Sequence, residues 1–523
     1  MRASLEKAGS KWSLGGLLVL ALVGIILAWI TTPWGVRVGY DSYFYLNAAE
    51  NLLKGLGLSS LSGEGQLVPL THFPPFYSIS LAAISLLSAG DILLAARWVA
   101  VLVYGFNLFL LGFLIFRYTS SWLAGLMSSS LFLISPIVMD TVVSAFSEGV
   151  FLACLLLALF FLTEGVENLN NRFLVSAGIA SALACLTRYV GVTVVLTGVF
   201  AIFFLSQAPV KKKIFSAIGY VALSGLPLFL WYVRNWIVAG STSNRIFAIH
   251  WPKKGNFLIG IDTITGWFLP QAIPIQIRQY ILLAGLIVLV IAIILWARRL
   301  RKERSPIKTQ PPFRFVLISL LFCLIYSLSL LISRSFFDAS TRWNSRILSP
   351  LYLVGFLTVI VVIWQAGQVA QFRWRKIMAY AAIVALFVSY LPQSYQFLLV
   401  SYREGNGFSG AAWNNSETMR LVEQFSPSGT LYSNNPTAIY FVLGRQAISI
   451  PEQYDRVIKK YRPEFEQNLA LMRERLKTPH SALVIFDPYQ EVRENPPLEE
   501  LTAGLVVFQD TSDGVIYIDP AQD

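Results

Sequence analysis

The strongest candidate for chemistry is Asp41, an acid with three tyrosines close to it in sequence, Tyr40, Tyr43 and Tyr45. Asp is a favoured N-cap residue, so a helix that begins at Ser42 would account for Asp41 without any chemistry. The tyrosines can instead form an aromatic wall with hydroxyl groups around the carboxylate. A carboxylate placed in this way can act as a general base. We therefore take Asp41 as the candidate catalytic residue and Tyr45 as a candidate substrate-binding residue.

A second acid, Glu148, opens an apolar run in the segment VSAFSEGVF. The helix macrodipole favours an acid in the first turn of a helix, and this effect alone would explain Glu148. An ionisable group at a membrane boundary also costs free energy unless it is paired or hydrated, which makes it a functional candidate. Asp140 is a similar but weaker candidate in the loop just before it.

Four arginines lie at the ends of apolar runs: Arg188, Arg234, Arg342 and Arg346. Each one alone is explained by a long side chain that reaches toward lipid headgroups. Four on one side suggest an anion site, because guanidinium groups bind phosphate through two parallel hydrogen bonds. His72, in the segment THFPPFY, is more simply a structural residue but could donate to phosphate when protonated.

A carboxylate near several cations suits one class of reaction. The carboxylate would deprotonate a nucleophile while the arginines stabilise a departing lipid-linked phosphate. We see no Gly-rich nucleotide-binding loop, which argues against an ATP-driven pump. A hard metal site would need several converging carboxylates, so we expect no metal and no cofactor besides the lipid-linked donor.

These side chains must be positioned by a membrane protein. Of the 523 residues, 55% are hydrophobic and 13% are charged, with a mean hydropathy of +0.60. A soluble protein carries roughly 25% charged residues. The net charge of +12 divides into +18 for residues 1–397 and −6 for residues 398–523. The positive charge therefore lies in loops between apolar runs, where it reports topology rather than nucleic-acid binding.

The positive-inside rule predicts eleven spans. Basic clusters lie near the N-terminus and at 211–213, 298–304 and 373–376, and all four are cytoplasmic if the 15-residue run 75–89 does not cross. That short run begins with two prolines and is more typical of an interfacial or re-entrant helix. The alternative is that it spans and the charge rule fails once. The predicted spans are 13–32, 95–116, 122–138, 148–163, 173–187, 190–206, 215–237, 280–297, 315–333, 346–366 and 378–397.

Residues 398–523 differ from the membrane part (1–397). Short β-rich runs alternate there with polar helical stretches near 414–425 and 455–477, which predicts a small α/β domain. With a cytoplasmic N-terminus, eleven spans place this domain and the first loop, 33–94, outside the cytoplasm. The expected location is the plasma (inner) membrane, with multiple passes.

The order of several short motifs resembles the GT-C superfamily of integral membrane glycosyltransferases. Within this superfamily, the chain is most similar to bacterial members of the group that contains protein O-mannosyltransferases and the lipid A aminoarabinose transferase. The resemblance covers about 40–350. The motifs are GYDSYFYLNAAE after the first helix, H-x-P-P-x-Y at 72–77, S-E at 147–148, L-T-R-Y at 186–189, R-N-W at 234–236 and R-x-L-x-P-L-Y at 346–352.

This resemblance implies a polyprenyl-phosphate-sugar donor, inverting displacement and a site on the extracytoplasmic side. Asp41 would then activate or orient the acceptor, Glu148 would be the second acid of the cavity, and Arg346 would lie at the cavity rim. His72 would stand near the position of the family's loop cation. This sequence departs from the family at three positions. Ser42 stands where the family has a second acid, and Phe44 and Phe73 stand where members of the family have basic residues.

Two other functions remain open from the sequence. One is a lipid-phosphate transporter or flippase that uses the same cations, although the matching halves typical of transporters are not evident. The other is a non-catalytic relative that acts as a scaffold. For the enzyme, the expected partners are a polyprenyl-phosphate sugar, the lipid bilayer and an acceptor of unknown identity, with no nucleic acid.

Overall fold

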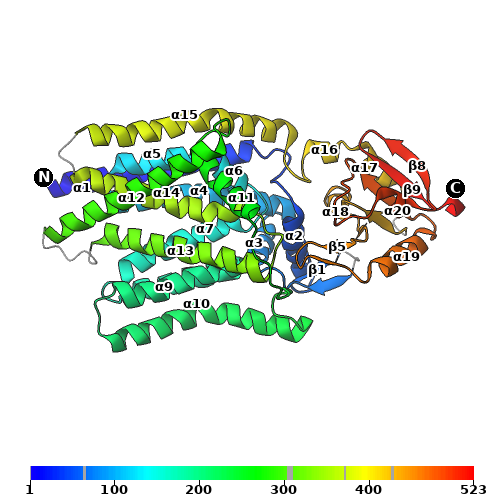
Figure 1. The fold of residues 1–523 in the computed structure, drawn as a ribbon, viewed down its shortest axis with the longest axis horizontal. Helices are drawn as coiled ribbons and strands as arrows, with labels where there is room; N and C mark the ends of the chain where they lie inside the picture. Colours follow the sequence, from blue (N-terminus) through cyan, green and yellow to red (C-terminus); the bar gives the residue numbers. More distant parts are fainter. Residues whose placement is uncertain (1, 63–65, 303–309, 370–372, 426–428, 523) are drawn as a thin grey trace.

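The computed structural model describes residues 2–62, 66–302, 310–369, 373–425 and 429–522. Residues 303 and 304 of the predicted basic cluster at 298–304 lie outside these ranges. A bundle of long helices forms one end of the molecule, and a smaller region with strands and helices forms the other (Figure 1). The helices up to residue 404 are α1 (Arg2–Ile30), α2 (Tyr40–Leu53), α3 (Phe76–Ser85), α4 (Ile92–Thr119), α5 (Trp122–Leu133), α6 (Pro136–Val142), α7 (Glu148–Gly165), α8 (Asn171–Thr187), α9 (Val192–Leu205), α10 (Val210–Ala239), α11 (Lys254–Gly266), α12 (Ile275–Lys302), α13 (Pro311–Phe336), α14 (Ser345–Val369) and α15 (Arg373–Glu404).

Seven helices in the described ranges are long and apolar enough to cross a membrane: α4, α7, α10, α12, α13, α14 and α15. The count rises to eight if α5 and α6, which bend by 66° at their junction, form one span. The apolar part of α1 and the helices α8 and α9 are shorter, so the count of eleven stays a prediction. The predicted interfacial run at 75–89 contains the short helix α3, of ten residues.

Small residues let the helices approach closely. A Cβ atom on Gly125 in α5 would lie 2.8 Å from the carbonyl oxygen of Gly112 in α4, so any larger residue would push the two helices apart. This close contact is typical of membrane helices, where packing replaces the hydrophobic effect. Helices at the edge of the bundle instead expose apolar side chains, as α12 does with Leu283, Ile287 and Val288.

The segment between α1 and α4 folds over the bundle end that faces the region with strands. It contains α2, a hairpin of β1 (Ser59–Leu61) and β2 (Leu67–Pro69), and α3. Arg234 of α10 fastens this segment, because its guanidinium donates to the carbonyl oxygens of Leu70 and Leu58, each at 2.9 Å. The hydroxyl of Tyr189 donates to the carbonyl oxygen of Thr71 at 2.6 Å.

Helix α2 begins at Tyr40, two residues earlier than an Asp41 cap would require. Its N-cap is Gly39, whose backbone N–H donates to the hydroxyl of Ser42 at 3.0 Å. The expectation that Asp41 caps a helix beginning at Ser42 is therefore wrong. Asp41 lies in the first turn, where an acid still interacts favourably with the helix dipole.

Residues 411–522 contain a five-stranded sheet of order β4–β3–β7–β9–β8. Strand β3 pairs in parallel with β4 and β7, whereas β9 pairs antiparallel with β7 and β8. The elements are α16 (Ala411–Asn414), α17 (Glu417–Gln424), β3 (Leu431–Ser433), α18 (Pro436–Leu443), β4 (Ile448–Ser449), β5 (Tyr454–Asp455), β6 (Lys460–Tyr461), α19 (Phe465–Leu476), β7 (Ala482–Phe486), α20 (Leu498–Thr502), β8 (Val506–Thr511) and β9 (Gly514–Ile518). One apolar cluster runs from α2 into this sheet and includes Tyr45, Met419 and Val484.

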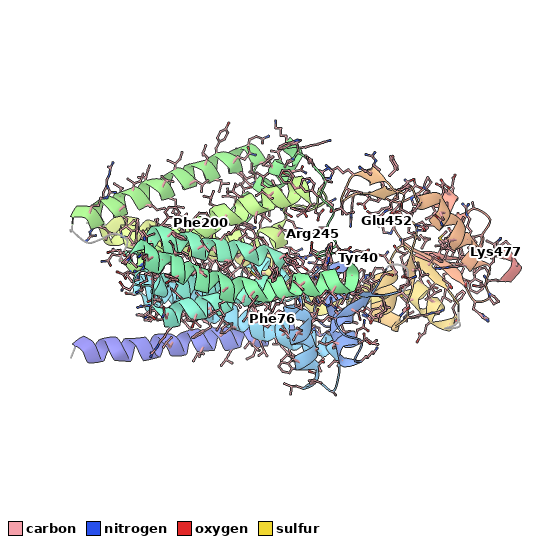
Figure 2. The ribbon with its side chains drawn as sticks, turned by 90° about the horizontal axis from the view of Figure 1, so that it is seen from below. Tyr40, Phe76, Phe200, Arg245, Glu452 and Lys477 are labelled. Carbon is pink, nitrogen blue, oxygen red and sulfur yellow. The ribbon has the colours of Figure 1, made fainter. Side chains whose placement is uncertain are left out.

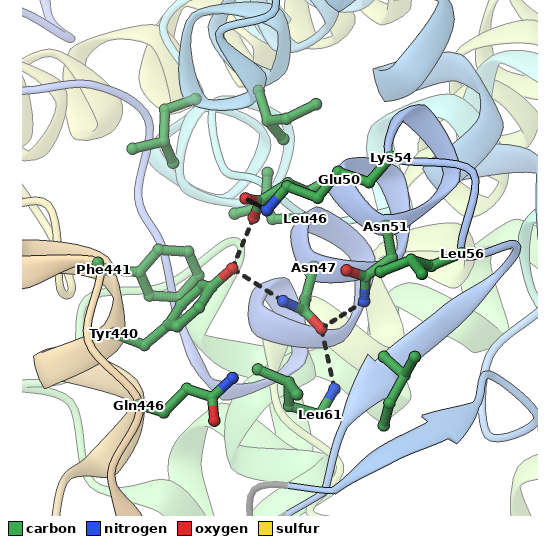
Figure 3. Close-up of a pocket in the computed structure, with 14 residues that line it drawn as sticks. Leu46, Asn47, Glu50, Asn51, Lys54, Leu56, Leu61, Tyr440, Phe441 and Gln446 are labelled. Atoms are coloured by element: carbon green, nitrogen blue, oxygen red, sulfur yellow. Dashed lines mark hydrogen bonds and ion pairs between the residues drawn. The ribbon is translucent and has the colours of Figure 1, made fainter. Parts of the chain in front are cut away.

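Helix α18 holds α2 by hydrogen bonds whose donors are uncharged hydroxyl and amide groups. The hydroxyl of Tyr440 donates to Glu50 at 2.6 Å and accepts from the amide of Asn47 at 2.8 Å (Figure 3). At the start of α2, the hydroxyl of Tyr40 donates to Asn435 at 2.9 Å. A cavity of about 510 Å³ lies beside Tyr440, between α2, the start of α4 and α18. Its polar side chains bond mainly to one another.

The substitution Tyr440→Phe should destabilise the contact between α2 and α18. It removes two hydrogen bonds, each worth about 1 kcal/mol, while keeping the ring that packs on Tyr43. The melting temperature of the purified protein should fall by a few degrees, and amide exchange in α2 should speed up. Tyr402→Phe, at an exposed tyrosine, is the control. Unchanged exchange in α2 would contradict this account of the contact.

Candidate functional site

Arg346, the second residue of α14, connects two acids that are far apart in sequence. Its Nη2 donates to the carboxylate of Asp41, and its Nε donates to Glu148 at 2.5 Å. The guanidinium carbon lies 4.3 Å from the centre of the Phe146 ring. The structure therefore brings together the two acids and one of the arginines that the sequence singled out.

Glu148 is the buried centre of this network. It is the first residue of α7, its side chain is 3% exposed, and it also pairs with Arg188 at the end of α8. Arg188 donates in addition to the hydroxyl of Ser147 at 3.3 Å, and that hydroxyl lies 2.9 Å from the hydroxyl of Tyr45. The Oε2 atom of Glu148 has no hydrogen-bond partner in the described residues.

The network is electrically balanced but unevenly buried. Two arginines face two carboxylates, which offsets the large free energy needed to bury each charge. Asp41 is 34% exposed and Arg346 is 26% exposed, so this end of the network is open. A substrate group can therefore reach Asp41 and Arg346 more easily than Glu148.

His72 lies on the same side, close enough to Asp41 for the two to interact electrostatically. Its side chain is exposed. The neighbouring protein atoms reduce the hydration of the His72 ring, and this effect and the positive charge of Arg245 lower the pKa of His72 below its ordinary value. The negative charges of Asp41 and Asp338 oppose this shift. Arg245 is a further basic residue of this site that was not predicted from the sequence. It is an exposed residue of the 240–253 loop, and only its position in a loop between apolar runs could have marked it.

The other candidates have different surroundings. Arg342 is exposed, and no ion pair of its side chain occurs within the described ranges. The guanidinium of Arg234 donates hydrogen bonds to backbone carbonyl groups. Asp140 pairs with Arg37 at 2.5 Å. Tyr40 and Tyr43 face α18 rather than a wall around Asp41. Of the three tyrosines, Tyr45 alone contacts the network, through Ser147.

Burial raises the pKa of the Tyr45 phenol, so this group is a neutral hydrogen-bonding partner near neutral pH. Among the described residues, no three His, Cys, Asp or Glu side chains converge on one point. The arrangement thus offers the partly exposed carboxylate of Asp41 and the guanidinium of Arg346, which can bind an anion. The titratable His72 and the cationic Arg245 lie nearby. Such a set can accept a proton and stabilise a leaving phosphate.

Comparison with known proteins gives one family. A family model described as dolichyl-phosphate-mannose-protein mannosyltransferase matches residues 72–232. No curated protein sequence matches the chain significantly.

Solved structures of low sequence identity share the fold. One is ArnT from Cupriavidus metallidurans bound to undecaprenyl phosphate, with a TM-score of 0.60, 12% identity and coverage of 96% of this chain and 98% of that one. Another is the Archaeoglobus fulgidus oligosaccharyltransferase AglB with an inhibitory peptide and a dolichol-phosphate, with a TM-score of 0.54, 14% identity and coverage of 91% and 70%. The chain is thus similar to this mannosyltransferase family over residues 72–232, and it shares the fold of ArnT across nearly the whole length of both chains.

Proposed function

We propose that the protein transfers a sugar from a polyprenyl-phosphate carrier to an acceptor outside the cytoplasm, with inversion at the sugar carbon. The observation that carries the proposal is the shared pairing of Arg346 with Asp41 and Glu148 at the open end of the bundle. The structural relatives add support, because ArnT was solved with undecaprenyl phosphate and AglB with dolichol-phosphate. The acceptor is a lipid, glycan or protein.

In the proposed reaction Asp41 is the general base. Its carboxylate takes the proton of the acceptor hydroxyl while the hydroxyl oxygen forms a bond to the anomeric carbon of the sugar. The bond between that carbon and the phosphate oxygen breaks, and the polyprenyl phosphate leaves with the electron pair. Because one bond forms as the other breaks on the opposite face, the configuration inverts. No cofactor is required besides the lipid-linked donor.

Glu148 and Arg188 hold Arg346 in place for this reaction. Arg346 uses its Nε for the buried Glu148 and its Nη2 for the more exposed Asp41. A phosphate group that approaches from the open side would replace Asp41 on Nη2, since a guanidinium binds phosphate in the same geometry as a carboxylate. The donor would thereby release the base as it binds. His72, Arg245 and Arg342 would contact the same phosphate.

Asp41→Asn tests the proposed base. Turnover should fall at least about 100-fold, because general-base catalysis contributes roughly that much or more. The measurement is loss of each donor in a panel of polyprenyl-phosphate sugars, with protein in nanodiscs and an envelope extract as the source of acceptor. Asp140→Asn is the matched control, since Asp140 is also paired with one arginine. An active Asp41→Asn protein would refute this role, whereas donor binding without consumption by the wild type would favour a scaffold or transporter.

Donor affinity should rise as the pH falls from about 7 to about 5 if His72 contacts the phosphate. The lowered pKa keeps His72 neutral at pH 7, and the donor is a phosphodiester whose charge does not change in this range. Binding then takes up one proton. His72→Gln should remove the rise, and Arg245→Gln should shift it toward higher pH, because the nearby charge is lost. An identical pH profile in His72→Gln would exclude the contact. Titration calorimetry measures both affinity and proton uptake.

The proposed topology has a cytoplasmic N-terminus and places residues 398–523 outside the plasma membrane, as a soluble domain on the catalytic module 1–397. A cysteine in place of Lys477, an exposed residue after α19, should react with a membrane-impermeant reagent on intact cells. A cysteine in place of Lys211, exposed at the start of α10, should react only after lysis. The reverse pattern would overturn the orientation.

A further inference from the structure

Three segments meet where the bundle joins the α/β region. The 240–253 loop runs beside the end of α13, where the N–H groups of Ala248 and His250 donate to Phe336 and Ser335 at 2.9 and 2.7 Å. The residues after α13 contact the β5–β6 turn, because the N–H of Ala339 donates to Val457 at 3.3 Å. Figure 2 places Arg245 of the loop at this junction.

Each of these segments contributes basic side chains. Lys253 comes from the loop, Arg334 from the last turn of α13, and Lys459 from the β5–β6 turn. Lys253 and Arg334 lie close enough to Lys459 to lower its pKa, in addition to the effect of burial. Within the described ranges none of the three forms an ion pair. We call these three residues the junction cluster.

The nearest acids are already engaged. Asp338, which interacts with Arg334, accepts hydrogen bonds from Ser340 and Thr341 at 2.6 to 2.9 Å. Asp455 pairs with Arg462 at 3.2 Å and accepts from two backbone N–H groups of its own turn. The junction cluster therefore keeps an excess of positive charge.

The same place holds the guanidinium of Arg334 and two buried side-chain nitrogens that have no hydrogen-bond partner in the described residues. Arg334 is 8% exposed, and no hydrogen bond of its guanidinium is found in the part of the chain that is described. Its carbon Cζ lies 5.8 Å from the ring of Trp343, whose Nε1 is buried and has no hydrogen-bond partner among the residues that the structure describes. The Nε2 of His250, close to Lys459 and Lys460, likewise has no partner within the described ranges. Buried polar groups normally have partners, so these donors indicate a missing acceptor.

We propose that the junction cluster binds a phosphate group, with Arg334 as the bidentate ligand and Lys253 and Lys459 as flanking charges. A phosphate offers several acceptor oxygens and negative charge, which matches a site with donors and cations but no free acid. The bound group would neutralise cations that otherwise repel one another across three segments, and would fasten the α/β region to the bundle. The site uses neither Asp41 nor Arg346 and does not depend on the proposed transfer reaction.

The test compares two double variants with equal loss of charge. Lys253→Gln with Lys459→Gln changes two exposed residues of the site, and Lys211→Gln with Lys477→Gln changes two exposed lysines elsewhere. The full-length protein, in phosphatidylcholine nanodiscs, is titrated with inorganic phosphate by calorimetry. The site variant should bind about tenfold more weakly, as expected for lost charged hydrogen bonds, and the control should bind like the wild type. Arg334→Lys, which keeps the charge but loses the fork, should also weaken binding.

A second arm separates a lipid headgroup from free phosphate. Phosphatidylglycerol retained on the wild type in native mass spectrometry, but lost from the site variant, would identify the ligand as a lipid phosphate. Binding of inorganic phosphate alone would identify a soluble ligand. Equal binding of both probes by the wild type and the site variant would overturn the proposal. Equal weakening in the site and control variants would do the same, because it would show a general effect of charge. Melting temperatures establish that each variant is folded.

Discussion

The rest of the structure depends on the cost of a buried charge at Glu148. A carboxylate with 3% exposure is tolerated only if cations lie directly against it, and Arg188 and Arg346 meet that need from α8 and α14. Removing one partner from a buried pair costs about 3–5 kcal/mol, since the remaining charge stays uncompensated. The free energy that binds three helix ends together is thus the same free energy that orients Arg346 toward Asp41. Folding and the preparation of the site are one process here.

Helix α2 links this network to the rest of the molecule. Asp41 attaches its first turn to Arg346, and Tyr45 attaches its second turn to Ser147. The other side of α2 contacts α18 through Tyr40, Asn47 and Glu50. Nine residues separate Asp41 from Glu50, which places them on opposite faces of a helix with 3.6 residues per turn. Helix α2 therefore connects the charged network of the bundle directly with the α/β region.

The sequence predicted the membrane class, a short helix near residue 76 and the charged residues of the network, because charge within apolar sequence is rare and easily noticed. The sequence alone could not show which of these residues contact one another. Arg346 and Asp41 are 305 residues apart, and no local pattern encodes that contact. It also misjudged residues whose local role was plausible. Asp41 suited an N-cap, but Gly39 is the cap, and Arg234 suited an anion site, but it binds backbone carbonyl groups. Arg245 lacked any periodic or motif context, so only the fold brings it near His72.

The two faces of α2 are held by interactions of different kinds, and this makes ionic strength a selective variable. Dissolved salt screens exposed charges over about 8–10 Å at physiological concentrations but leaves neutral hydrogen bonds almost unchanged. The pair of Asp41 and Arg346 lies at the open end of the network and is accessible to ions. The hydrogen bonds between α2 and α18 all have uncharged donors, and the carboxylate of Glu50 is the acceptor in only one of these three bonds. In concentrated salt the first turn of α2 would loosen from the bundle while its attachment to α18 persists. The carboxylate of Asp41 would then follow the α/β region.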